Sequence, residues 1–158
     1  MQIRRVVTGY DDAGRPTVCS DGAAPAVVDL PPEVGASIVD LWRSDALPLG
    51  TTGRSDPTVD TPFSLMPPGS LFRVIDLAPG GHAPLWHTTA SVDFVYVASG
   101  TATLLHGDPD APDEVTVATG ETVVQRGIHH AWVNRGDEPC RLVDVSVAAT
   151  LPAGVEPH

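Results

Sequence analysis

Proline and glycine occur throughout this chain and leave little room for a long helix. Sixteen prolines and fifteen glycines are spread over 158 residues, and the apolar runs between them are short and rich in valine. Because proline interrupts helices and β-branched residues favour strands, the sequence predicts an all-β protein. A chain of this length is expected to form one domain.

The charged residues exclude several partners and chemistries. Nine basic residues stand against twenty acidic ones, which gives a formal net charge of −11. The sequence therefore lacks the basic patch that nucleic acid or an anionic membrane surface requires, and we expect neither as a partner. All nine basic residues are arginine, so a lysine Schiff base, a lysine general base and a P-loop are excluded.

The cysteines and the hydropathy indicate the compartment. Cys19 and Cys140 are far apart and have no CxxC spacing, so we expect reduced thiols. The basic pair near the N-terminus is soon followed by polar residues, and no stretch approaches the roughly 18 apolar residues of a membrane span. We therefore expect a cytoplasmic protein with no cleaved leader.

Turn signals divide the chain into short, evenly spaced strands. Residues 4–10 are expected to pair with 16–20 as a hairpin. Residues 36–43 are interpreted as a strand, although a short helix also fits so short a run. Further strands are predicted over residues 71–77, 86–98, 101–106, 114–117, 122–126, 130–134 and 141–148. Such spacing is typical of a sandwich, a jelly roll or a barrel.

The predicted chain has four parts. Residues 1–22 form an N-terminal hairpin arm, and residues 23–70 form a strand followed by a long lid or wrapping loop rich in proline and glycine. Residues 71–150 form the barrel core, and residues 151–158 form a C-terminal tail. The stretch 47–70 is too long for a simple connection, and loops of this length are usually lids or disordered segments.

Polar residues occupy strand positions where core residues are expected. Residues of equal parity share one face of a strand. One such face carries His87, Thr89, Ser91, Asp93, Val95 and Val97. If the two valines face the barrel interior, the polar side chains line it and must be paired, hydrated or bound to a ligand. The alternative is that this face is exposed and that the opposite face packs in the core.

A second polar region places two histidines side by side. His129 and His130 are adjacent, so on a strand one faces inward and the other outward. An inward His130 would share its face with Trp132 and would meet His87 and Asp93 across the barrel. A lone histidine in a strand is more often a satisfied core or surface group than a ligand.

The two regions resemble the paired motifs of the cupin superfamily. The first motif is matched at the corresponding spacing by Gly81, His87, Thr89, Asp93 and Gly100. The second is matched by Gly120, Gly127, His130 and Asn134, with Gln125 in place of a proline. The resemblance covers residues 70–148 and implies a double-stranded β-helix, or jelly-roll barrel. More loosely, the whole chain looks like a bacterial group of small single-domain cupins.

The chain departs from the cupin pattern at two positions. Typical metal-binding cupins use three histidines and a glutamate, but here Thr89 replaces a histidine and Asp93 replaces the glutamate. The resemblance leaves His87, Asp93 and His130, which have the composition of a two-histidine, one-carboxylate metal site. The same residues also suit a metal-free acid–base pocket. In a third interpretation they only hydrogen-bond a ligand or water.

Three functions follow from these interpretations. The first is a small enzyme of lyase or isomerase type (a dehydratase, decarboxylase or cyclase) that acts on a small polar or phenolic metabolite. Its catalytic residues would be His87, Asp93 and His130, and its substrate-binding residues would be Thr89, Gln125 and Trp132. The second is a metal-dependent oxygenase or decarboxylase that binds Fe, Mn, Ni or Zn weakly through the same catalytic set. The third is a non-catalytic module that binds a small molecule in the barrel.

Two further expectations concern geometry and assembly. We expect His87, Thr89, Asp93 and His130 to converge in one pocket inside the barrel, with His129 pointing away from it. We also expect a homodimer through the N-terminal strands, because exposed strand edges are normally covered or paired. The alternative is a monomer whose hairpin folds back on its own barrel.

Overall fold

The computed structural model describes residues 2–48, 55–59, 61–65 and 69–158. This part of the chain contains eleven strands and no helix, which confirms the all-β prediction. The strands are β1 (Arg4–Tyr10), β2 (Pro16–Ala23), β3 (Ala26–Asp29), β4 (Ala36–Ser44), β5 (Ser70–Leu77), β6 (Ser91–Ser99), β7 (Thr101–Asp108), β8 (Ala111–Ala118), β9 (Thr122–Arg126), β10 (His130–Val133) and β11 (Cys140–Ala148).

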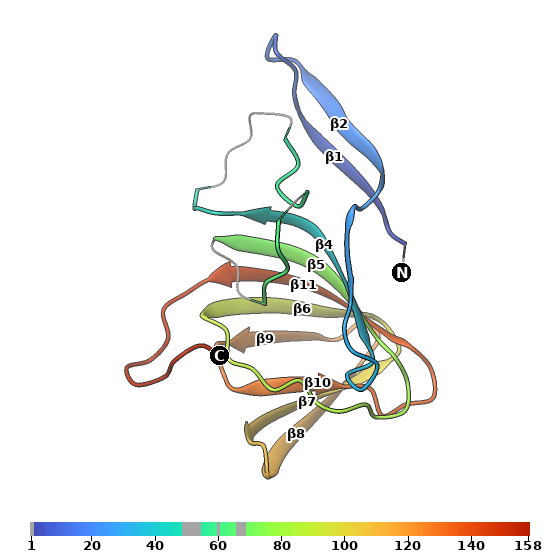
Figure 1. Cartoon of the computed structure of the whole chain (residues 1–158), viewed down its shortest axis with the longest axis vertical. Helices are drawn as coiled ribbons and strands as arrows, with labels where there is room; N and C mark the ends of the chain where they lie inside the picture. The colour runs from blue at the N-terminus through green and yellow to red at the C-terminus, as the bar shows by residue number, and fades with distance from the viewer. Residues whose placement is uncertain (1, 49–54, 60, 66–68) are drawn as a thin grey trace.

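The strands form two larger sheets and a separate hairpin. The six-stranded sheet has the order β3-β4-β5-β11-β6-β9, and the three-stranded sheet has the order β10-β7-β8. Strands β1 and β2 pair only with each other and project from the barrel (Figure 1). The main core cluster joins both sheets, since it contains Val97 and Leu142 from the larger one and Ala102 and Val117 from the smaller one. The architecture is the expected jelly roll.

Cross-strand rows divide the interior of the larger sheet into an apolar end and a polar end. Ile38, Ile75 and Leu142 are successive partners across β4, β5 and β11. The next row in the same direction contains Asp40, Arg73 and Asp144. The row beyond it contains Ser146, Asp93 and Gln125. The alternation of strand faces therefore places two rows of polar side chains at one end of the barrel.

The strand predicted over residues 86–98 is wrong at its N-terminal end. Strand β6 begins at Ser91, and of the preceding residues His87 alone forms a β-bridge, with His130. The backbone of Thr88 pairs instead with His158 of the C-terminal tail, through N–O distances of 3.0 and 3.1 Å. The tail thus supplies the hydrogen bonds that a neighbouring strand would otherwise have made.

Other boundaries differ from the predictions in smaller ways. The short strand β3 was not predicted, because its four residues lie between prolines. Strand β8 begins at Ala111 rather than Glu114, and it tolerates Pro112 because it lies at the edge of its sheet. The hairpin of β1 and β2 and the strand β4 are confirmed.

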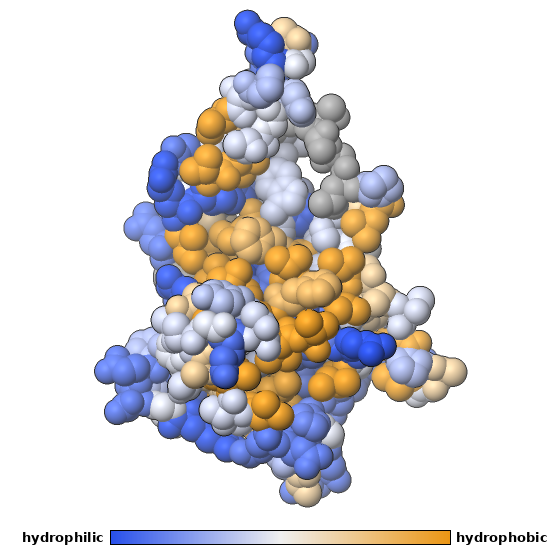
Figure 2. Space-filling model, turned by 180° about the vertical axis from the view of Figure 1, so that it is seen from behind, coloured by the Kyte–Doolittle hydropathy of each residue, from blue (hydrophilic) through white to orange (hydrophobic). Residues whose placement is uncertain are grey.

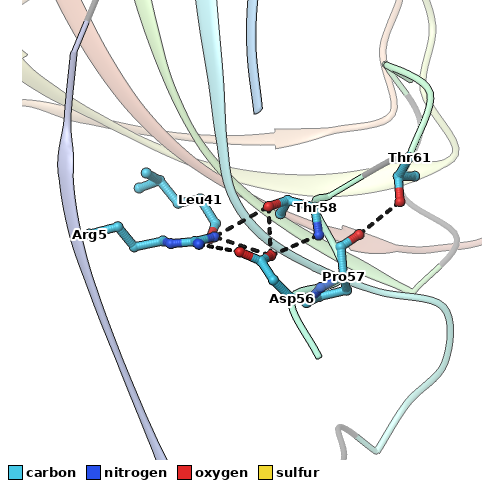
Figure 3. Close-up of polar contacts among 6 residues, drawn as sticks. All are labelled: Arg5, Leu41, Asp56, Pro57, Thr58 and Thr61. Atoms are coloured by element: carbon cyan, nitrogen blue, oxygen red, sulfur yellow. Dashed lines mark hydrogen bonds and ion pairs between the residues drawn. The ribbon is translucent and has the colours of Figure 1, made fainter. Parts of the chain in front are cut away.

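The hairpin is tied to the barrel by a partly buried arginine (Figure 3). The Arg5 guanidinium donates to the Leu41 carbonyl at 2.8 Å and forms an ion pair with Asp56, which Thr58 supports through its own hydrogen bonds. Asp56 and Thr58 belong to the predicted lid, of which residues 49–54, 60 and 66–68 lie outside the described residues. The described portion near Asp56 thus anchors the arm.

An exposed apolar row crosses the outer face of the larger sheet. Phe72, Val145, Phe94 and Val124 are successive cross-strand partners on β5, β11, β6 and β9. Their exposed fractions range from 36% for Val145 to 60% for Val124. One side of the molecule carries a broad apolar surface (Figure 2).

Within the described ranges, no helix has the length and apolar character needed to cross a membrane.

Candidate functional site

A cavity of about 90 Å³ lies inside the barrel, where the polar and apolar rows meet. Its apolar wall includes Ile38, Ile75, Leu142 and Trp132, and Leu65 from the predicted lid also lines it. Its polar wall consists of Arg73, His87, Thr89, Asp93, Gln125, His130, Asp144 and Ser146. The cavity can therefore enclose a ligand with one polar end and one apolar end.

The structure brings the predicted site residues together. His87, Thr89, Asp93 and His130 all line the cavity, as do Gln125 and Trp132. His129 is not among the lining residues; its ring packs between Trp86 and His158, at centroid distances of 5.0 and 4.9 Å. The predicted convergence and the opposite orientation of His129 are confirmed, although residues 86–90 are not part of the strand.

Gln125 joins the predicted carboxylate to one of the histidines. Its side-chain nitrogen donates to Asp93 Oδ2 at 2.7 Å and to His130 Nε2 at 2.9 Å. The other Asp93 oxygen accepts a bond from Ser91 at 2.7 Å, and the Ser91 hydroxyl also lies 2.9 Å from that of Thr89. All five residues are buried. The network holds Asp93 in place by both of its oxygens.

The hydrogen bonds of His130 define its tautomer. Its Nδ1 lies 2.9 Å from the Ile128 carbonyl, which can only accept, so Nδ1 carries the proton. The lone pair on Nε2 then receives the Gln125 amide proton. Burial, followed by the charge of the nearby His87, lowers the pKa of His130 to about 3. His130 is therefore neutral near pH 7, with both ring nitrogens engaged.

His87 has the same tautomer but a free nitrogen. Its Nδ1 lies 2.9 Å from the Leu85 carbonyl and so carries the proton. No residue in the described part of the chain is hydrogen-bonded to its Nε2. Burial lowers the pKa of His87, against the opposing effects of the Leu85 hydrogen bond and the Asp93 charge. A neutral imidazole with an unengaged lone pair in a cavity is suited to accept a proton.

Asp144 is a site residue that was not predicted. One carboxyl oxygen accepts a bond from Ser146 at 2.8 Å, while the other, Oδ1, is buried without a hydrogen-bond partner among the described residues. Burial, and secondarily the Asp93 charge, raises the pKa of Asp144 to about 7. Strand alternation could have identified it, because Asp144 and Ser146 share the face of the buried Leu142.

Arg73 was not predicted either. Only 3% exposed, it forms an ion pair with the buried Asp40 through Nε and Nη2, at 3.0 and 2.9 Å. Its Nη2 also donates to the Ser64 carbonyl at 2.8 Å, and the guanidinium carbon lies 5.4 Å from the ring centroid of Phe63. Arg73 thus links strand β5, inside the barrel, to residues 61–65 of the predicted lid.

The arrangement of His87, Asp93 and His130 does not fit a metal ion. A metal ligand needs a free lone pair, but the only lone pair on Nε2 of His130 already accepts the hydrogen bond from the Gln125 amide, so this imidazole has none left for a metal. The rings of His87 and His130 are tilted by 59° with centroids 4.2 Å apart. In the described residues no group of three or more His, Cys, Asp or Glu side chains is placed to hold a metal.

Comparisons with known proteins agree with the fold and the motifs. The model of the "Cupin domain" family matches residues 73–146. An Aspergillus oryzae protein described as "Oryzines biosynthesis cluster protein J" is 34% identical over 84% of this chain and 75% of its own length. "Cupin-domain-containing oxidoreductase fogC" from Aspergillus ruber is 27% identical over 91% of this chain and 71% of its own length.

A further relative and two solved structures complete the comparison. "Phomopsin biosynthesis cluster protein D" from Diaporthe leptostromiformis is 34% identical over 68% of this chain, and the chain spans 59% of that protein. A cupin-2 domain structure from Rhodospirillum rubrum has a TM-score of 0.51 and 12% identity, over 98% of this chain and 74% of that one. The structure of hydroxypropylphosphonic acid epoxidase from S. wedmorenis has a TM-score of 0.50 and 18% sequence identity. This match covers 70% of this chain and 50% of that one. The curated relatives are fungal, so they do not support the looser likeness to a bacterial group.

Proposed function

The chain belongs to the cupin domain family, and from this premise we propose that it is an isomerase- or lyase-type enzyme of small-molecule biosynthesis that works by proton transfer inside the barrel. Relatives described as proteins of biosynthesis clusters support the small-molecule role. The carrying observation is that the free Nε2 of His87 and the Asp144 carboxyl face one cavity. The proposal assigns the base to His87 and the acid to Asp144.

The simplest reaction that these groups can perform is isomerisation of a hydroxy carbonyl compound. His87 Nε2 removes a proton from the carbon that carries the hydroxyl, next to the carbonyl, so that a C–H bond breaks and an N–H bond forms. The electron pair moves through the new C=C bond to the carbonyl oxygen, which takes a proton from Asp144 to give an enediol. Return of the His87 proton to the other carbon, and of the other hydroxyl proton to Asp144, completes the isomerisation with no net proton change.

A network of buried side chains lies next to the base, because the ring of His130 contacts that of His87. Asp93, Gln125 and His130 form a hydrogen-bonded network. Both N–H groups of the Gln125 side chain are used in it, one by Asp93 and one by His130. A side chain fixed by packing and hydrogen bonds keeps the reacting groups within the narrow tolerance that proton transfer requires. In this proposal Asp93 and His130 are therefore positioning residues, and Gln125 connects them.

A metal-dependent oxidoreductase is the second candidate function. The Aspergillus ruber relative is described as an oxidoreductase, and that description favours it. The hydrogen bond from Gln125 opposes this function, because Nε2 of His130 would have to lose that bond before it could bind a metal. Purification without chelator, followed by elemental analysis, separates the two: stoichiometric Fe, Mn, Ni or Zn favours the oxidoreductase.

Solvent deuterium exchange tests the proton-transfer function. Hydroxyacetone, acetoin and dihydroxyacetone are incubated with EDTA-treated protein in D₂O, and incorporation of deuterium beside the carbonyl is followed by proton NMR. The proposal predicts exchange by the wild type that falls at least about 100-fold in His87→Gln, the typical contribution of a general base. His82→Gln, outside the cavity, serves as the control. Equal exchange by wild type and His87→Gln for every compound contradicts the proposal.

A further inference from the structure

Two buried oxygens of the polar wall lack hydrogen-bond donors. Gln125 Oε1 and Asp144 Oδ1 have no partner in the described part of the chain, and their residues are only 3% and 6% exposed. A buried acceptor left unpaired costs about 1–3 kcal/mol, and native proteins pair nearly all such groups. Both residues line the cavity, so its occupant is in a position to supply the missing donors.

We propose that the substrate carries two hydroxyl groups, which donate to Gln125 Oε1 and Asp144 Oδ1, on a short carbon skeleton that packs against the aliphatic wall. This inference rests on the proposed function and names the class of its substrate. The hydroxyl at Asp144 is the one that returns a proton to the ionised carboxyl in the second half of the isomerisation, after Asp144 has protonated the carbonyl oxygen. The hydroxyl at Gln125 is a recognition contact.

The charges around the cavity favour a neutral ligand. The guanidinium of Arg73 is already paired with Asp40, while Asp93 and Asp144 add two more acidic groups to the same polar end. An anionic ligand would meet these carboxyl groups without a free countercharge. The free nitrogen of His87 is also an acceptor. The wall thus offers acceptors for hydroxyl protons and little for a carboxylate or phosphate.

The strand order determines how the two hydroxyls are separated. Gln125 lies on β9 and Asp144 on β11, with β6 between them. Neighbouring strands are about 4.8 Å apart, so these two backbones are roughly 10 Å apart and their side chains approach the ligand from different directions. We therefore place the hydroxyls on different carbons of the ligand.

The cavity volume limits the size of the enclosed part. Its 90 Å³ is smaller than the roughly 150 Å³ of a cavity that accepts benzene. A skeleton of about four carbons is therefore expected to fit, and Ile38, Ile75 and Leu142 supply its apolar contacts.

A matched series of four-carbon probes tests the inference. Butane-1,3-diol, butan-1-ol and 1,3-dimethoxybutane offer two, one and no hydroxyl donors, and 3-aminobutan-1-ol replaces one hydroxyl by an ammonium. Binding is measured from the ¹H–¹⁵N chemical shifts of the Gln125 side-chain amide. The inference predicts that the diol binds about tenfold more tightly than the dimethoxy compound, with the alcohol between them. Equal affinities mean that water satisfies both oxygens, and tighter binding of the amine means a cationic ligand; either result overturns the inference.

Two variants at Asp144 separate recognition from folding. Asp144→Leu removes the acceptor, and we expect the diol to bind this variant no better than butan-1-ol. Asp144→Asn keeps an acceptor oxygen and should retain most of the preference, while Asp110→Leu, in an exposed turn, should not change it. Thermal melting confirms that each variant is folded. If His87-dependent deuterium exchange persists without a diol preference, this inference alone fails; a diol preference without exchange contradicts the function instead.

Discussion

The side-chain amide of Gln125 donates a hydrogen bond to Nε2 of His130 across 2.9 Å. This contact makes the two cavity histidines different, although they share a tautomer and their rings are in contact. In His130 both nitrogens are engaged within the protein. In His87, Nε2 remains available to the cavity. We therefore assign the proton transfer to His87 and a positioning role to His130.

Replacing Gln125 by leucine should destabilise the protein by about 1–3 kcal/mol. Leucine has a similar volume but no donor, so Asp93 Oδ2 and His130 Nε2 would each lose a buried hydrogen bond. Urea unfolding at pH 7 measures the change, and Thr122→Ala, exposed on the same strand, is the control. A Gln125→Leu protein as stable as the wild type would show that the network does not hold the site.

The raised pKa of Asp144, about 7 against an ordinary 3.8, should appear in the pH dependence of stability. Below about pH 4 the carboxyl is protonated in both the folded and the unfolded chain. As the pH rises toward 7, the unfolded carboxyl ionises while the folded one keeps its proton, so the wild type loses stability. The loss amounts to a few kcal/mol in order of magnitude and is complete above pH 7.

Comparison of the wild type with Asp144→Asn isolates this effect. The variant cannot ionise, so its free energy of unfolding should rise relative to that of the wild type between pH 4 and 7. His130, whose lowered pKa makes the protein less stable as the pH falls from 6.5 toward 3, affects both proteins equally. Denaturant unfolding at several pH values provides the measurement. A constant difference across this range would mean that Asp144 ionises normally.

Removing Asp40 should be more damaging than removing the whole ion pair. Asp40→Asn leaves the buried Arg73 charge without its partner and should cost about 3–5 kcal/mol. The double replacement Asp40→Leu and Arg73→Met removes both charges and should recover much of this loss. Asp21→Asn, which breaks the exposed pair with Arg4, is the control with little expected effect. Equal losses in the single and double variants would contradict the prediction.

The strand pattern and the turns were predictable because local chemistry determines them. The alternation of polar and apolar residues on β6 correctly placed Asp93 and Val95 on the interior face. The start of β6 could not be predicted, since it depends on a backbone pairing between Thr88 and His158 at the far end of the chain.

The candidate site was predicted in part. His87, Thr89, Asp93 and His130 were found by parity and motif spacing, but parity could not show that Gln125 occupies the His130 lone pair. Asp144 and Arg73 carry the same alternation signal and were overlooked because they lie outside the two motifs. Their pairing across β5 and β11 depends on register, which the sequence alone does not specify.

We expect a homodimer, and the structure suggests which surface to test. The apolar row of Phe72, Val145, Phe94 and Val124 on the outer sheet is contiguous with a groove between the hairpin and Phe72. A second copy suits this row, because a two-fold axis brings the row onto itself and covers its exposed apolar side chains. The hairpin arm, which carries the exposed Val18, would extend over the partner.

Light scattering at micromolar concentration tests the dimer. The wild type should have twice the chain mass of 16.5 kDa, and Val124→Lys should shift the mass toward the monomer. Val115→Lys, which is exposed on the other sheet, is the control and should remain dimeric. A wild-type monomer, or a dimer unaffected by Val124→Lys, would contradict this surface.

The most direct test of the account is a long-range ¹H–¹⁵N NMR measurement of the histidine rings during a Zn²⁺ titration at pH 7. The account predicts that His87 and His130 are both neutral with the proton on Nδ1. Stoichiometric Zn²⁺ should leave the Nε2 resonance of His130 unchanged. The Thr89→His variant, which adds an imidazole, should bind Zn²⁺ more tightly than the wild type. Simultaneous coordination shifts at Nε2 of both histidines in the wild type would show a metal centre and contradict the proton-transfer account.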